Sequence, residues 1–72
     1  MKPTHELIQI AAAGGGLRLP ANVKPTHELV QIAAAASNKG CHVYLTNAGT
    51  KPTHELVQIG AAGKGCVIFE FE

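Results

Sequence analysis

The residues with the greatest capacity for chemistry in this chain are three histidines in a repeated Thr-His-Glu sequence. His5, His27 and His54 each follow a threonine and precede a glutamate. Three histidines are the ligand set of one type of catalytic zinc site, and a neighbouring glutamate would act there as a general base. On a helical wheel, however, each histidine lies on the polar side, with the glutamine four residues later. We therefore expect solvated histidines that bind no metal within one chain, with a zinc site between chains as the alternative.

Two cysteines form a second candidate group. Cys41 and Cys66 lie far apart in the sequence and lack the Cys-x-x-Cys spacing of redox and zinc motifs. One disulfide would be possible, but nothing in the sequence indicates secretion. We expect two free, buried thiols at the beginnings of strands.

A glycine-rich segment and a single serine complete the candidates. The segment Gly60–Gly65 resembles a phosphate-binding loop, but no serine or threonine follows Lys64, and the segment lies before a strand rather than before a helix. A helix end followed by a turn is the simpler interpretation. Ser37 is the only serine, and no base has a spacing that would make it a nucleophile. We expect no catalytic, cofactor-binding or metal-ligating residues, and no enzyme.

The composition excludes several classes of protein. The 72 residues allow one domain. The formal net charge is +1 and only 15% of residues are charged, which argues against nucleic-acid binding and, with 46% hydrophobic residues, against disorder. No apolar run is long enough for a membrane span, and Pro3, His5 and Glu6 interrupt the position of a signal peptide. We expect no membrane partner and a cytoplasmic location in an expressing host.

An internal repeat dominates the sequence. The nine-residue block Lys-Pro-Thr-His-Glu-Leu-Ile/Val-Gln-Ile occurs three times and varies at one position, which is Ile8, Val30 or Val57. Repeats of this kind determine the whole fold. The copies begin at Lys2, Lys24 and Lys51 and divide the single domain into units 1–22, 23–49 and 50–72.

The pattern of identity between copies points to how the chain was made. Natural repeats diverge at all positions, including those on their solvent-exposed side, but here the exposed-looking positions are identical while the connecting segments share almost nothing. Recent duplication and human assembly from one cassette both produce this pattern. We interpret the chain as an engineered or de novo α/β repeat protein.

Each copy predicts an amphipathic helix. In the second copy Leu29, Ile32 and Ala36 share an apolar side, and Pro25 suits the first helical turn because its missing N–H is not needed there. Asn38 or Gly40 would end this helix. The predicted helices cover Pro3–Ala13, Pro25–Ala36 and Pro52–Ala62.

Short alternating runs between the helices predict strands. In Cys41–Thr46 one side carries Val43 and Leu45, and the other carries His42 and Tyr44. The run Val67–Glu72 alternates in the same way, with Glu70 and Glu72 expected to face solvent, and Leu17–Leu19 is a shorter candidate that Pro20 would end at the edge of a sheet.

The order of elements predicts an α/β fold with two layers. Three αβ repeat units, in the order α-β-α-β-α-β, would place the helices on one face of a small three-stranded sheet. Parallel sheets usually need cover on both faces, but three helices of this length cover only one. Either the sheet is partly antiparallel or chains associate. We favour a homodimer or a higher homo-oligomer, with exchange of strands or helices between identical cassettes as a route to it.

A weak resemblance concerns the part of the chain from Leu19 onward. The segment Asn22-Val23-Lys24-Pro25 opens a helix with Val30-Gln31, and Gly60, Lys64, Gly65 and the strand Val67–Phe71 come later. This order is similar to that of the histidine phosphocarrier protein HPr of the sugar phosphotransferase system. The resemblance implies helices on an open-faced sheet. It does not imply phosphocarrier activity, because Asn22 stands where that family has its phosphorylatable histidine.

We therefore expect a structural scaffold that folds, self-associates and has no evolved biochemical function. The alternatives are a small binding module that holds a protein or phosphate ligand near Asn22–Pro25, where helix N-termini offer free N–H groups, and the zinc site formed by the repeated histidines.

Overall fold

Each copy of the repeated block begins a helix at its threonine. In the computed structural model, which describes residues 3–71, α1 covers Thr4–Ala12, α2 covers Thr26–Lys39 and α3 covers Thr53–Gly63. The proline before each helix has an extended ψ of 151–154°, and its carbonyl accepts the first hydrogen bonds from the glutamate and leucine N–H groups. Because of that extended ψ, the prolines are N-cap residues, and the prediction that they lie inside the first turn is wrong by one residue.

The second helix is longer than predicted. It continues past Ala36 and ends at Gly40, one of the two predicted ends, which adopts the left-handed conformation with φ of 71°. The N–H groups of Gly40 and Cys41 then donate to the carbonyls of Ser37 and Ala36. This is a Schellman ending, and it satisfies the carbonyls of Ala36 and Ser37 in the last turn of α2.

The three strands form one fully parallel sheet. β1 covers Leu17–Pro20, β2 covers Val43–Thr46 and β3 covers Val67–Phe69, in the order β1-β2-β3. Leu17 is in register with Val43, which is in register with Val67. The partly antiparallel alternative is therefore wrong. β1 includes Pro20, which lies at the end of an edge strand, where its missing N–H is tolerated.

The strands differ from the sequence prediction mainly at their ends. β2 begins two residues after Cys41, and β3 ends at Phe69; the predicted extension to Glu72 reaches outside the described residues. Two 3₁₀ helices that the sequence did not predict, η1 (Ala21–Val23) and η2 (Ala48–Thr50), follow β1 and β2. They carry the chain from each strand to the proline of the next unit.

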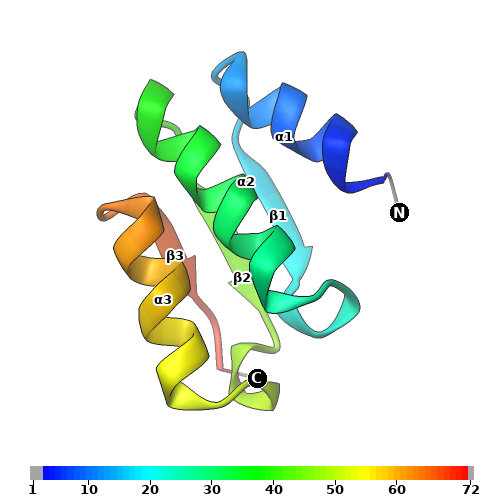
Figure 1. Ribbon diagram of the computed structural model, residues 1–72, viewed down its shortest axis with the longest axis vertical. Coiled ribbons are helices and arrows are strands. Elements are labelled where there is room, and N and C mark those ends of the chain that lie inside the picture. The colour runs from blue at the N-terminus through cyan, green and yellow to red at the C-terminus, as the bar shows by residue number, and fades with distance from the viewer. Residues whose placement is uncertain (1–2, 72) are drawn as a thin grey trace.

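The helices lie side by side on one face of the sheet, with α2 between α1 and α3 (Figure 1). The predicted two-layer α/β fold with three αβ units is thus confirmed. Leu29 and Ile32 of α2 and Val43 and Leu45 of β2 are almost completely buried. The middle unit supplies the centre of the core because it alone has a neighbouring unit on each side.

The other face of the sheet is open. Arg18, Tyr44 and Ile68 occupy one row across the three strands, and all three side chains are exposed. The predicted division of β2 is confirmed, since Val43 and Leu45 face the helices while His42 and Tyr44 do not. The open face carries the polar groups of the candidate site.

Candidate functional site

The threonine and glutamate of the repeated block connect neighbouring helices. The hydroxyl of Thr26 on α2 donates a hydrogen bond to Oε1 of Glu55 on α3 at 2.5 Å. The Thr4 hydroxyl on α1 donates in the same way to Oε1 of Glu28 on α2. Both pairs are partly buried. Thr4 and Thr26 therefore each bind the glutamate of the following unit, a contact that the sequence interpretation missed.

The repeated histidines lie on the outside of the helices. His5, His27 and His54 are exposed, and Nε2 of each lies 3.9–4.0 Å from an oxygen of the glutamate that follows it. Within residues 3–71 no group of three or more His, Cys, Asp or Glu side chains is arranged to hold a metal ion. The structure places one histidine on each helix and does not bring all three together.

A groove between α2 and α3 brings two of these histidines to one surface. The groove has a volume of about 790 Å³, and His27 and His54 line it, one from each helix. The carboxylate of Glu55 in the same groove is already engaged by Thr26. The other lining residues are Val30, Gln31 and Gln58.

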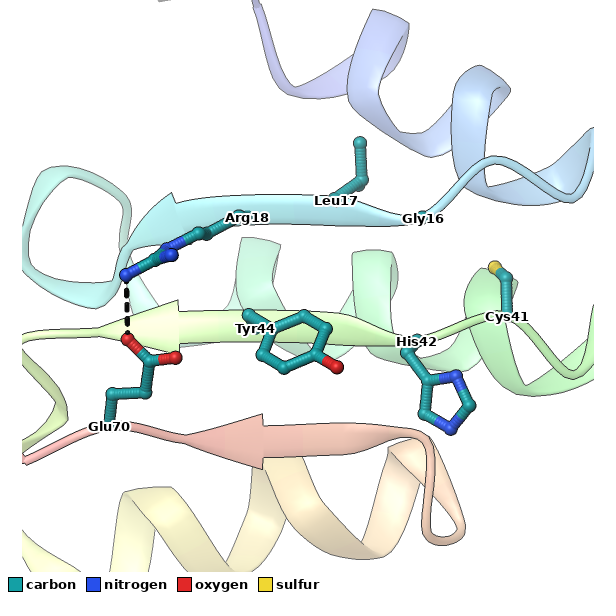
Figure 2. Close-up of a pocket in the computed structure, with 7 residues that line it drawn as sticks. All are labelled: Gly16, Leu17, Arg18, Cys41, His42, Tyr44 and Glu70. Atoms are coloured by element: carbon teal, nitrogen blue, oxygen red, sulfur yellow. Dashed lines mark hydrogen bonds and ion pairs between the residues drawn. The ribbon is translucent and has the colours of Figure 1, made fainter.

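A second hollow lies on the open face of the sheet and measures about 600 Å³ (Figure 2). The Tyr44 ring lies over β2, and the His42 imidazole extends from the chain before β2 toward the side of β3 (Figure 2). Nη2 of Arg18 on β1 donates to Oε1 of Glu70, which follows β3, at 3.0 Å, so this ion pair spans the middle strand. Gly16, Leu17 and Cys41 complete the lining.

Glu70 lies at the open face of the sheet, on the side where the sequence pattern placed it. The pattern did not predict that it is half-buried there and paired with Arg18. Its backbone N–H also donates to the Leu45 carbonyl, and its carbonyl accepts the N–H of Ala48. These partners are far from Glu70 in the sequence, so no local pattern signals them.

The two cysteines are free thiols. They are half-buried rather than buried, and they precede β2 and β3 instead of beginning them. The Cys41 thiol donates to the carbonyls of Ala11 at 3.5 Å and Ala36 at 3.6 Å. It therefore fills the junction between α1, α2 and the start of β2.

The remaining candidates have structural roles. Gly60–Gly65 is the end of α3 and a turn, as predicted: Lys64 is left-handed with φ of 50° and Gly65 has φ of 91°. The Ser37 hydroxyl donates to the Ala34 carbonyl of its own helix at 2.8 Å. In the segment of the HPr resemblance, Asn22 is exposed on η1 and Pro25 is the N-cap of α2.

Comparison with protein-family models, with curated proteins and with solved structures finds no match to this chain. None of the helices within residues 3–71 has the length and apolar character that crossing a membrane requires.

Proposed function

We propose that this chain is a structural module without catalytic activity, and that its cassettes bind one another both within a chain and between chains. The observation that supports this proposal is the repeated contact between helices. Thr4 reaches Glu28 and Thr26 reaches Glu55 by the same hydrogen bond. Each cassette thus carries one side that receives the preceding cassette and one side that receives the following cassette. A surface of this kind favours a homo-oligomer.

Light scattering coupled to size-exclusion chromatography tests the proposal. The expected result is a mass above 7.5 kDa that increases with loading concentration. A mass that stays at one chain over the whole accessible concentration range would overturn it. Exchange of a helix–strand unit between chains would also raise the mass, because identical cassettes compete for the same place.

The repeated surface supports an engineered or duplicated origin. Thr4, Thr26, Glu28 and Glu55 have partners in neighbouring units, which gives a physical reason for threonine and glutamate at these four places. The histidines and the glutamines Gln9, Gln31 and Gln58 are exposed in all three units and are nevertheless identical. Copying of one cassette accounts for their identity without any selected activity.

The hollow on the open sheet face favours a second candidate function, a small binding module. Its volume of about 600 Å³ lies within the usual range for ligand sites. Arg18 and His42 line it, and an anion bound there would take the place of the Glu70 carboxylate as the partner of Arg18. Titration with inorganic phosphate, followed by amide NMR, tests this candidate. Shifts confined to Arg18, His42 and their neighbours support it, and unchanged spectra at millimolar phosphate count against it.

A further inference from the structure

The last position of the repeated block shows which side of each helix faces the preceding unit. Ile10, Ile32 and Ile59 occupy this position, and their exposed fractions are 36%, 1% and 0%. Within residues 3–71 the only helix beside α3 is the preceding one, α2, and Ile59 on α3 is fully buried. In the same range the only helix beside α1 is the following one, which is again α2, and Ile10 on α1 is partly exposed. The isoleucine at the end of the block therefore faces the preceding unit, and the first unit has no preceding unit to cover it.

The variable position of the block marks the opposite side. Ile8 on α1 and Val30 on α2 are half-buried and pack against the core. Val57 on α3 occupies the same position and is 63% exposed. Because α3 has no following helix, this position faces the following unit. The molecule therefore ends on one side with a largely exposed Val57 and on the other side with a partly exposed Ile10.

The backbone hydrogen bonds repeat from strand to strand in the same direction. The Leu17 N–H on β1 donates to the His42 carbonyl at 3.1 Å, and the Val43 N–H on β2 donates to the Cys66 carbonyl at 2.8 Å. Across a trans peptide the C=O and the next N–H point in opposite directions. The Val67 N–H therefore points to the outer edge of β3, and the Gly16 C=O points to the outer edge of β1. If the strand-to-strand pattern continued, the Val67 N–H would be the next donor and a Gly16 carbonyl would be the next acceptor.

We propose that α3 and β3 of one chain dock on α1 and β1 of a second copy of this chain, so that the fourth unit in the series is the partner's first unit. This inference rests on the self-association proposed above and specifies its geometry. Val57 would be covered against the partner's helix that carries Ile10, and the Val67 N–H would donate to the partner's Gly16 carbonyl. The exposed Thr53 hydroxyl would stand opposite the partner's Glu6, as Thr26 stands opposite Glu55.

This contact joins two different surfaces, so it is heterologous. A heterologous contact leaves one unoccupied α3–β3 end and one unoccupied α1–β1 end on every oligomer. Further chains can therefore add at both ends unless the rotation between chains closes a ring. The chain would form linear stacks of αβ units, in which each unit contacts only its neighbours. The expected product is a series of oligomers whose length depends on concentration, not a closed dimer.

Two variants with one blocked end each test this geometry. Val57→Lys places a charge on the α3 end, and Ile10→Lys places the same charge on the α1 end, so the two altered ends also repel each other. Both side chains are exposed in the single chain, and circular dichroism verifies that the fold is kept. Tyr44→Lys, on the open sheet face, is the matched control. Each sample is measured by sedimentation velocity, alone and as an equimolar mixture of Val57→Lys with Ile10→Lys.

We expect each end variant alone to be a monomer, Tyr44→Lys to associate like the unaltered chain, and the mixture to form a one-to-one dimer and nothing larger. In the mixture, the intact α3 end of the Ile10→Lys chain can dock on the intact α1 end of the Val57→Lys chain. The two outer ends of that dimer both carry the added lysine, so no third chain can bind. Two monomeric variants that stay monomeric when mixed would contradict the heterologous contact. Association that survives both end substitutions but is lost in Tyr44→Lys would show a dimer through the sheet face: the end-to-end geometry would then be wrong, while self-association itself would stand.

Discussion

The hydroxyl of Thr26 on α2 donates to the carboxylate of Glu55 on α3 at 2.5 Å, and the same two cassette positions connect α1 to α2. The contact gives a structural role to both polar positions of the block, to the threonine in the first two copies and to the glutamate in the last two. It also divides the Thr-His-Glu sequence into parts with different roles. Threonine and glutamate join neighbouring units, whereas the histidine between them is exposed.

The first prediction concerns this hydrogen bond. Thr26→Val keeps the shape of the side chain and removes the hydroxyl, which leaves Glu55 without its donor. We expect the free energy of unfolding to fall by about 1 kcal/mol, measured by urea denaturation at a concentration where the chain is monomeric. Thr53→Val is the matched control, because Thr53 holds the same cassette position at the exposed end of the helix layer. Equal losses in the two variants would contradict this role for Thr26.

The second prediction compares two copies of one isoleucine. Ile59→Ala removes a fully buried side chain, and such truncations cost about 2–5 kcal/mol. A single core of this size gives roughly 3–5 kcal/mol of net stability, so we expect the variant to be largely unfolded at 37 °C. Ile10→Ala changes the same position where it is partly exposed, and it should lower the melting temperature far less. Similar melting temperatures for both variants would be inconsistent with the assignment of this position to the preceding unit.

The third prediction concerns two glycines of α3. A Cβ on Gly60 would lie 3.7 Å from the Phe69 ring, which is an ordinary contact, and the equivalent position in α2 is Ala33. Gly60→Ala should therefore stabilise the protein by about 0.5–1 kcal/mol, because alanine favours the helical conformation more than glycine does. A Cβ on Gly63 would lie 2.3 Å from Cγ2 of Val67, so Gly63→Ala should destabilise it by about 1–3 kcal/mol. Thermal denaturation of both variants checks the opposite signs.

The fourth prediction concerns metal ions. Each repeated histidine lies beside its own glutamate on the outside of a different helix. We expect the same melting temperature and the same sedimentation profile with zinc and with a chelator. Faster sedimentation with zinc would revive the metal site between chains. A higher melting temperature alone that is lost when His27→Gln and His54→Gln are combined would instead locate a zinc site in the groove between α2 and α3 of one chain.

Much of the fold follows from patterns that are local in the sequence. The apolar spacing around Leu29 and Ile32 defines the buried side of a helix, and the alternation in Val43–Leu45 defines the buried side of a strand. Their order then requires crossovers that place the helices together. The predicted ends of the helices and strands were less accurate. They depend on backbone angles such as the extended ψ of Pro25, which side-chain periodicity does not encode.

The contacts between units were not predictable in the same way. Thr4 and Glu28, or Arg18 and Glu70, meet only after the sheet has formed. Because the copies are identical, the sequence also does not show which cassette lies beside which. The signal that was available is the identity of Thr and Glu at polar positions, which fits contact between copies as well as it fits duplication.

Small-angle X-ray scattering of the unaltered chain over a range of concentrations tests the central claim most directly, because it reports the shape of the oligomers as well as their size. When α3 and β3 of one chain dock on α1 and β1 of the next, the oligomer grows in the plane of the sheet, across the strands. We predict that the radius of gyration increases with concentration while the cross-section stays that of one two-layer unit. Growth in the cross-section at constant length, or scattering from a single chain at every concentration, would contradict the account.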